Sequence, residues 1–245
     1  VDPDRKMVLR SGRLPRVLSP NDEQAVEAAL RIKDTRECKI TIISLGADLH
    51  GEIVKKPIAM GADELILLED DAFDDGDSWT TAHALARAIK KIGAYDMILC
   101  GRQAADWDSG IVGSGIAEIL GLPSVTTARK IDIRDGKARV ERVTPDGYEV
   151  IELSLPGVIM VSNELGQARY ATIQGTIEAM KKPPVIWKPE DIGLTSSDCG
   201  NRGRRLELLK LFHPIHEGKC EMIEEETPEE SAIMLARRLR EEKVL

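Results

Sequence analysis

The sequence predicts an α/β fold with a doubly wound, mostly parallel sheet. Three observations lead to this class. Short apolar runs alternate with amphipathic helical segments over residues 21–120. The links between them are short, which favours parallel strands with helices on both faces. The composition is 42% hydrophobic but only 3% aromatic, so the core is expected to be aliphatic.

The first half of the chain alternates helix and strand signals. Helices are expected where apolar residues recur three and four positions apart, and strands where short runs are rich in β-branched residues. The expected elements are a helix over 21–33, a strand over 39–45, a helix over 48–60, a strand over 64–70, a helix over 77–92, a strand over 95–101 and a helix over 109–120. Asp77 or Ser78 is expected to cap the third helix, and Gly121 to end the fourth.

The middle of the chain changes character. Residues 128–143 and 147–162 alternate polar and apolar side chains, and Asp135-Gly136 and Asp146-Gly147 are typical turn dipeptides. These patterns predict antiparallel strands added to the sheet.

The last part of the chain is less regular. Residues 181–205 are rich in proline, glycine and polar residues, which indicates an extended arm. A strand is expected over 206–212, and a capped helix runs from Thr227 to about 242. We therefore expect a nucleotide-binding α/β domain over 1–183 and, over 184–245, an arm and helix that pack on a partner protein.

Composition excludes several classes of function. A net charge of -8 with few aromatic residues argues against nucleic-acid binding. No apolar run approaches the ~20 residues of a membrane span, so direct membrane insertion is not expected. The N-terminus lacks the apolar stretch of a signal peptide, and the widely spaced cysteines read as free thiols, which favours the cytoplasm. No HExxH, CxxC or GxSxG motif occurs, so no metal ligand and no catalytic residue is assigned.

The strongest candidate site is the segment 101–115, GRQAADWDSGIVGSG, between an expected strand and an expected helix. Ligands of open α/β sheets lie at the carboxyl ends of strands, and helix N-termini bind phosphates through free N–H groups. Gly110, Gly113 and Gly115 would let the backbone approach a ligand closely. The alternative is a tight turn in which Gly113 and Gly115 only permit helix packing.

Two further segments are candidates. Residues 163–175 carry an exposed-looking Arg169-Tyr170 pair and the apolar Ile173, which suits partner docking, although on spacing alone an ordinary connection with a half-buried tyrosine fits the pattern better. The acidic run 69–77 could bind a cation, but a solvated loop is the better interpretation because calcium-loop spacing is absent.

Several motifs together resemble one known family. The run GRQAADWDSGIVGSGIAEILGLPSVT resembles the signature region of electron-transfer flavoprotein β subunits, a GxQAxDxD loop followed by a helix that ends in LG-x-P. NELGQARYATI resembles their NEPRYAT loop, and LSPNDEQAVEAALRIKD resembles their NPxDExAxEEAxRxK helix. GADELILLED and KPEDIG also have counterparts, so the resemblance covers nearly the whole chain. The family usually starts with a strand ending in KQVPDT, of which only residues 1–4 have a counterpart here.

The resemblance implies a Rossmann-like, adenine-nucleotide-binding subunit of a heterodimer. In this family the α subunit carries an FAD, and the β subunit holds AMP or, in FixA-like electron-bifurcating members, a second FAD that accepts hydride from NADH. The positions that match nucleotide contacts are Ser19, Asp22, Leu45, Gln103, Ala104, Asp106, Trp107, Asp108, Ser109, Gly110, Ile111, Val112, Gly113 and Ser114. Arg169, Tyr170 and Ile173 match the partner-binding loop.

The identity of the nucleotide stays open at this point. Val112-Gly113 and the segment DGYEVIELSLP resemble the bifurcating type, whereas Trp107 and Ile111 match neither type and Ala168 replaces the proline of NEPRY. Gly110 would leave room for a longer diphosphate. The subunit is thus expected to bind FAD or AMP, and to oxidise NADH only in the bifurcating case.

The expected function is electron transfer between dehydrogenases and an acceptor. The expected partners are an α subunit and a dehydrogenase or quinone-linked oxidoreductase. Two other classes remain possible from the residues alone. One is a stress-protein-like regulatory module that binds ATP or AMP without a redox role, and the other is a stand-alone α/β nucleotidyl- or amidotransferase.

Overall fold

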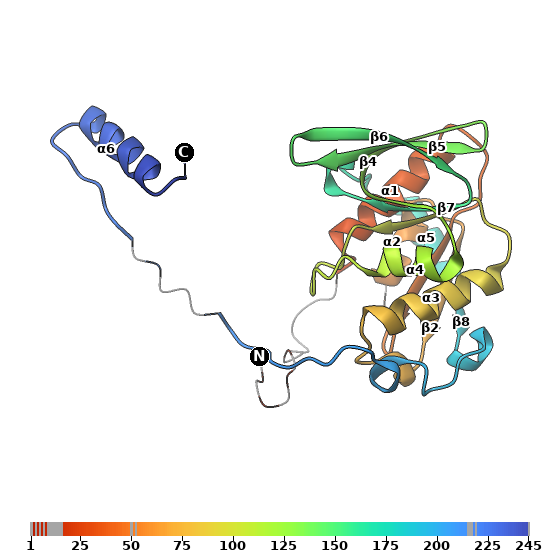
Figure 1. The fold of residues 1–245 in the computed structure, drawn as a ribbon. Helices are drawn as coiled ribbons and strands as arrows, with labels where there is room; N and C mark the ends of the chain where they lie inside the picture. Colours follow the sequence, from red (N-terminus) through yellow and green to blue (C-terminus); the bar gives the residue numbers. More distant parts are fainter. Residues whose placement is uncertain are drawn as a thin grey trace. The chain divides into compact units, whose positions relative to one another are not determined.

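The computed structural model describes residues 2, 4, 6, 8, 17–49, 51, 53–214, 218 and 220–244 of the chain. The chain forms two compact units (Figure 1). One spans Ser11–Glu207, and the other combines Val1–Arg10 with Leu208–Leu245. The first unit contains a mixed α/β fold, and the second contains helix α6 (Pro228–Glu241).

The elements of the first unit follow the predicted order as far as residue 162, and helix α5 and strand β8 come in addition to it. Its helices are α1 (Pro20–Lys33), α2 (Lys56–Met60), α3 (Ser78–Ile92), α4 (Val112–Leu120) and α5 (Ile173–Lys181). Its strands are β1 (Thr41–Gly46), β2 (Glu64–Glu69), β3 (Met97–Gly101), β4 (Ser124–Arg134), β5 (Lys137–Thr144), β6 (Gly147–Ser154), β7 (Gly157–Val161) and β8 (Val185–Trp187). The helix expected over 48–60 is shorter than predicted, since it consists of a 3-10 turn, Ile53–Lys55, followed by α2. Residues 50 and 52 of that range lie outside the described residues.

The strands form two sheets rather than the single sheet that the sequence predicts. The first has the order β1-β2-β8, and the second has the order β3-β7-β4-β5-β6. All pairs in the first sheet are parallel, and so are β3-β7 and β4-β7 in the second. The pairs β4-β5 and β5-β6 are antiparallel, as the alternating pattern predicts. The same prediction is wrong for residues 157–161, which form β7 and pair in parallel with β3 and β4. Among the described residues, β1 ends the first sheet beside β2, and β3 ends the second sheet beside β7.

Helices join the two sheets and cover both faces of the second one. On one face, Ala25 and Ala28 of α1 pack with Val161 and Leu99. On the other face, α3 and α4 pack with Val158 and Ile98, and Ile43 of the first sheet belongs to the same cluster. Helix α1 also contributes Val26 and Leu30 to the core of the first sheet. These shared clusters position the end of β3 beside the first turn of α1.

Local signals set the ends of the helices as predicted. Asp77 caps α3, because its carboxylate accepts a hydrogen bond from the Thr80 N–H (2.9 Å). Gly121 ends α4 in the left-handed conformation with φ 67°. The Asp135-Gly136 turn also has positive φ at both residues, 48° and 73°, which matches a two-residue hairpin turn.

The segment after residue 184 differs from the expected extended arm. Strand β8 pairs with β2, and Ile192, Leu194 and Cys199 are buried against Leu68 and Ala84. Apolar residues scattered among the prolines and glycines therefore dock this segment on the first unit as far as Gly203.

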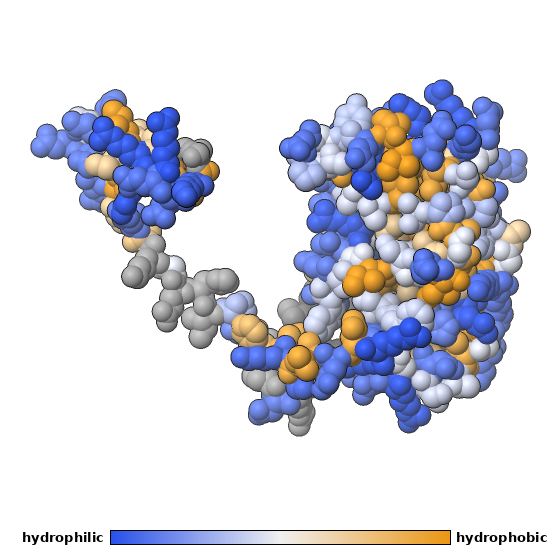
Figure 2. Space-filling model, viewed as in Figure 1, coloured by the Kyte–Doolittle hydropathy of each residue, from blue (hydrophilic) through white to orange (hydrophobic). Residues whose placement is uncertain are grey.

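The strand predicted over 206–212 is wrong. These residues form no regular element, and Leu206, Leu209 and Phe212 are more than half exposed at 62%, 75% and 57%. The predicted C-terminal helix is confirmed as α6, with Thr227 and Glu230 forming a capping box. Apolar side chains of α6, including Ile233 and Leu235, lie on its surface (Figure 2). No helix in the described part of the chain is long and apolar enough to cross a membrane.

Candidate functional site

The candidate loop runs from the end of β3 to the start of α4 and is held by the first turn of α1. The carboxylate of Asp22 accepts a hydrogen bond from the Gly101 N–H (3.1 Å). The Asn21 side-chain amide donates to the Gln103 carbonyl (2.9 Å). A side chain on Gly101 would lie 2.7 Å from the Asn21 backbone, so glycine is required for this close approach. The first turn of α1, which contains Asp22, is therefore joined directly to the loop.

Side chains of the loop also hold its own conformation. The Gln103 amide donates to the Asp108 carboxylate (2.8 Å), and the Asp108 N–H donates to the Ala104 carbonyl (3.1 Å). The Asp106 carboxylate accepts from the Trp107 N–H (2.8 Å). In this structure Asp106 and Asp108 thus form hydrogen bonds within the loop and stabilise its conformation.

Two loop residues have left-handed backbone conformations, Asp108 with φ 50° and Gly110 with φ 62°. A Cβ on Gly110 would find its nearest neighbour, the Arg102 carbonyl, 3.7 Å away. Glycine is favoured at position 110 because the backbone φ is positive. From the sequence alone, Gly110 was instead explained by the room that it would leave for a ligand.

The N-terminus of α4 lacks a side-chain cap. Ile111 occupies the N-cap position and accepts no hydrogen bond through its side chain. Backbone N–H groups at the start of an α-helix have no intrahelical acceptors, and they carry partial positive charge. The Ser109 hydroxyl contacts that of Ser78 on α3 (3.1 Å), and the Ser114 hydroxyl faces Met160 Sδ (3.6 Å). Among the described residues, Ile111 therefore supplies no side-chain acceptor to the start of α4.

Buried polar atoms beside the loop test whether a nucleotide fits. Arg102 Nε is buried and has no hydrogen-bond partner among the described residues. Burial raises the pKa of Asp22, an effect that hydrogen bonds from the Gly101 N–H and the Ser19 hydroxyl only partly offset. A buried donor without an acceptor is costly, so Arg102 Nε fits a site that a phosphate-bearing ligand completes.

The glycines of α4 correct part of the sequence argument. A Cβ on Gly113 would lie 2.5 Å from Met160 Cγ and 2.7 Å from Cys100 Sγ, both of which belong to the sheet. A Cβ on Gly115 would lie 2.9 Å from that of Ala82 on α3. The lack of a side chain at Gly113 and Gly115 therefore permits close packing of α4, which is the alternative given in the sequence analysis. Any contact of Gly113 with a nucleotide would involve its backbone.

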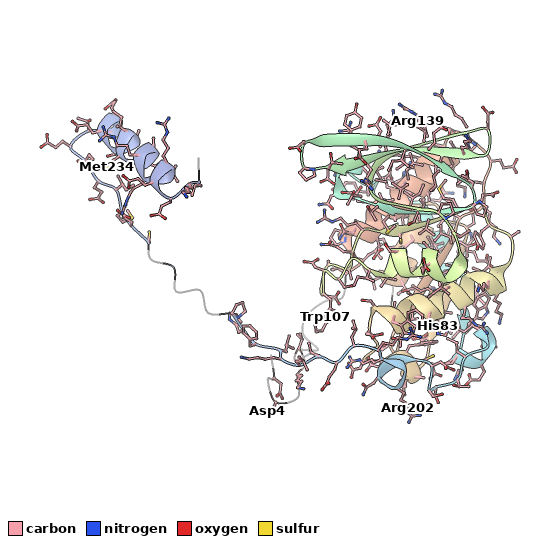
Figure 3. All side chains as sticks on the ribbon, viewed as in Figure 1. Asp4, His83, Trp107, Arg139, Arg202 and Met234 are labelled. Atoms are coloured by element: carbon pink, nitrogen blue, oxygen red, sulfur yellow. The ribbon has the colours of Figure 1, made fainter. Side chains whose placement is uncertain are left out.

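The remaining predicted nucleotide contacts differ in exposure. Trp107 and Ile111 are 57% and 54% exposed, and Trp107 lies at the tip of the loop (Figure 3). Val112 packs, partly buried, beside Ile116 in the α3–α4 cluster. Leu45 near the end of β1 packs, partly buried, against the cluster of Leu68.

The predicted partner-binding residues lie elsewhere, in a segment held by α1. Tyr170 and Ile173 are 81% and 84% exposed, which agrees with a docking surface. Arg169 was expected to be exposed, but it is partly buried, because its guanidinium binds Glu27 (2.9 Å) and Asp34 (2.6 Å). Burial alone would raise the pKa of Glu27, but hydrogen bonds from Arg169 and Arg31 outweigh this effect and lower it.

The acidic run is explained by local structure. Asp70 accepts from the Ala72 N–H (2.9 Å), and Asp77 caps α3 while accepting from the N–H groups of Arg205 (2.8 Å) and Leu206 (3.0 Å). Among the described residues, no group of three histidine, cysteine or acidic side chains could hold a metal ion.

Burial, with Asp22 nearby, raises the pKa of the Cys100 thiol to about 12.

Sequence reasoning missed Asn21, Arg102 and Glu27. The spacing of Glu27 contains a usable signal, because it stands among Ala25, Val26 and Ala28 where a core-facing residue is expected. A buried carboxylate requires partners, and Arg31 one helical turn later is the first of them.

Comparison with known proteins agrees with this geometry. The Electron transfer flavoprotein domain family matches residues 6–191. The chain is 40% identical to the caffeyl-CoA reductase-Etf complex subunit CarD of Acetobacterium woodii, over 100% of this chain and 94% of that protein. It is 39% identical to an electron transfer flavoprotein subunit beta of Thermoanaerobacterium thermosaccharolyticum, over 87% and 82% of the two chains. It is 32% identical to protein FixA of Azorhizobium caulinodans, over 87% and 79%. The resemblance found in the sequence is thereby confirmed, and the chain belongs to the electron transfer flavoprotein family.

Proposed function

We propose that this chain is the β subunit of a heterodimeric electron-transfer flavoprotein and binds a nucleotide with the loop between β3 and α4. The loop, its attachment to α1 and the uncapped N-terminus of α4 carry this proposal. Relatives named as electron transfer flavoprotein β subunits support it. The buried, unpaired Arg102 Nε favours a ligand with phosphate or ribose oxygens over an empty loop.

Each part of the site has a role in holding the nucleotide. The N–H groups at the start of α4 and the Ser109 hydroxyl would bind phosphate oxygens. Gln103 and Asp108 keep the loop in its conformation through their mutual hydrogen bond. A bound flavin would supply the redox chemistry, while the protein supplies position and electrostatics.

We favour FAD over AMP as the nucleotide in this subunit. Val112-Gly113 and the segment 146–156 resemble the bifurcating type. A similar protein, CarD, is named as a subunit of a caffeyl-CoA reductase-Etf complex. In this case the complex would accept electrons from NADH.

Nucleotide analysis of the complex tests both levels of the proposal. The chain is co-expressed with its α subunit, the complex is denatured, and FAD and AMP are quantified per heterodimer. Two FAD with bleaching by NADH support the bifurcating function. One FAD with one AMP would replace it by the ordinary electron carrier, and a complex without either nucleotide in this subunit would contradict the proposed site.

We also propose that the segment around Tyr170 and Ile173 docks a dehydrogenase or another flavin-linked oxidoreductase. An exposed apolar side chain at the start of α5 suits insertion into an apolar pocket of the partner. The stress-protein-like regulatory module is the competing function, and it predicts nucleotide binding without a flavin in either subunit.

A further inference from the structure

We infer that Glu27 is a positioning residue that holds residues 165–173, here called the docking segment, in the conformation that presents Tyr170 and Ile173. This inference rests on the docking role proposed above. It adds a buried residue of another element that would act through Arg31 and Arg169 without touching the partner.

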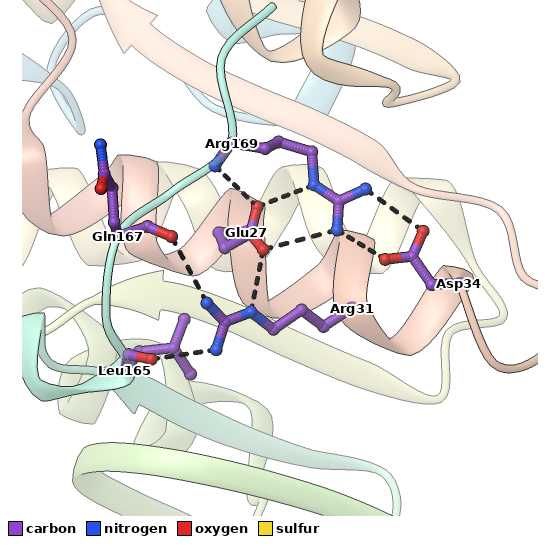
Figure 4. Close-up of polar contacts among 6 residues, drawn as sticks. All are labelled: Glu27, Arg31, Asp34, Leu165, Gln167 and Arg169. Carbon is purple, nitrogen blue, oxygen red and sulfur yellow. Dashed lines mark hydrogen bonds and ion pairs between the residues drawn. The ribbon is translucent and has the colours of Figure 1, made fainter.

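The Glu27 carboxylate lies between two guanidinium groups (Figure 4). Glu27 is only 4% exposed. Its Oε1 accepts from Arg31 Nε (2.8 Å), and its Oε2 accepts from Arg169 Nε (2.9 Å) and from the Arg169 backbone N–H (3.1 Å). One carboxylate thus binds both a side chain and the backbone of the docking segment.

The two guanidinium groups extend these contacts along the segment. Arg31 donates to the carbonyls of Leu165 (2.9 Å) and Gln167 (3.4 Å). Arg169 donates to both oxygens of Asp34, at 3.2 Å and 2.6 Å. Helix α1 therefore holds the segment at positions 165, 167 and 169.

Apolar contacts and a helix cap hold the segment between and beyond these points. Leu165 is buried beside α1, and Ala168 and Ala171 pack against the core of the first sheet. The Thr172 hydroxyl accepts from the Gly175 N–H (2.9 Å) at the start of α5. With Arg169 and Ala171 held inward, Tyr170 and Ile173 face solvent.

Removal of the Glu27 charge acts on the segment specifically. In Glu27→Gln the guanidinium groups of Arg31 and Arg169 lose the anion between them and repel each other in a partly buried site. The backbone N–H of Arg169 loses a charged acceptor. If this opens the segment nine-tenths of the time, the apparent dissociation constant of the partner rises about tenfold, because only the closed fraction is competent to bind.

The test uses the complete αβ complex and a flavin-linked dehydrogenase from the same source that exchanges electrons with the wild-type complex. Electron-transfer rates are measured against dehydrogenase concentration, and hydrogen exchange of the amides of residues 169–173 is followed in the complex alone. Glu27→Gln is compared with Asp34→Asn, which removes only the outer partner of Arg169 and keeps the buried contacts. Lys33→Gln is the matched control, because Lys33 on the same helix pairs with Asp63 (2.6 Å) and not with the docking segment.

We expect Glu27→Gln to speed exchange of these amides and to raise KM for the dehydrogenase about tenfold, with kcat within about twofold of wild type. Asp34→Asn should show the same pattern with a smaller rise, and Lys33→Gln should show neither change. Unchanged exchange in Glu27→Gln, or faster exchange with unchanged KM, overturns the positioning role. If Ile173→Ala also leaves KM unchanged, the docking proposal itself fails, and the inference falls with it. If Glu27→Gln does not fold, the same criteria apply to Asp34→Asn.

Discussion

Replacement of Gly113 by valine tests whether this glycine serves packing or ligand approach. The added Cβ would lie 2.5 Å from Met160 Cγ and 2.7 Å from Cys100 Sγ, closer than side-chain carbons approach in folded proteins. Met160 is 1% exposed, so its side chain cannot move away from the added Cβ into solvent. The clash lies inside the packing of α4 on the sheet.

The cost follows from this geometry. Overpacking of a dense core destabilises by about 1–3 kcal/mol, and valine regains only a few tenths of a kcal/mol over glycine through helix propensity. A unit of this size loses roughly 2–4 °C of melting temperature per kcal/mol. We therefore expect a melting temperature lower by roughly 2–12 °C, with nucleotide released only as the unit unfolds.

Thermal unfolding of the αβ complex is recorded together with nucleotide content below the transition. Gly110→Ala serves as the comparison, since its Cβ has room and its cost of about 1–2 kcal/mol comes from the positive φ alone. Shortening Met160 to alanine should partly rescue Gly113→Val and should not rescue Gly110→Ala. A Gly113→Val complex that melts like wild type but lacks nucleotide would refute the packing argument.

Three further predictions concern single side chains. Asp77→Ala should destabilise the first unit by about 1–3 kcal/mol, because the carboxylate caps α3 and accepts from the N–H groups of Arg205 and Leu206. Burial alone would raise the pKa of Asp77, but the hydrogen bonds from these N–H groups outweigh burial and lower the pKa below 3.8. The stabilisation by Asp77 is therefore present above pH 3.8 and disappears as the pH falls through the folded-state pKa. An equal stability difference between variant and wild type at neutral and at strongly acidic pH would contradict this. Ile173→Ala should weaken dehydrogenase binding by ~2 kcal/mol while the melting temperature stays that of wild type, and equal rates at limiting dehydrogenase would remove the anchor role. Trp107→Gly should change the absorption or the retention of a nucleotide-site flavin, and identical spectra with full occupancy would show that the indole does not contact it.

The sequence predicts the elements well where periodicity and caps agree. Helices α1, α3 and α4 and strands β2 and β3 follow the expected order with shifted ends. The strand expected over 206–212 failed because an apolar run predicts burial only when something packs on it. Leu209 and Phe212 remain exposed among the described residues of this chain.

The site was predictable in outline and not in detail. The spacing of strand, loop and helix locates the candidate loop between β3 and α4, because that signal is local. Contacts between distant residues are not visible to periodicity, and Arg169 and Glu27 are separated by 142 positions. Arginine is usually a surface residue, so the residue type gives no indication that Arg169 pairs with the buried Glu27. That pairing depends on the tertiary structure.

Helix α1 connects the two proposed activities of the subunit. Its first turn, with Asn21 and Asp22, holds the candidate nucleotide loop, and its later turns, with Glu27 and Asp34, hold the docking segment. A rise of about 1.5 Å per residue places Asp22 and Asp34 roughly 18 Å apart along one helix axis. Because the helix packs on both sheets through Val26, Leu30 and its alanines, this separation is fixed by the core. The distance between the loop and the docking segment is therefore fixed by the fold. A partner bound at Ile173 would lie at that distance from the nucleotide site without any rearrangement on binding.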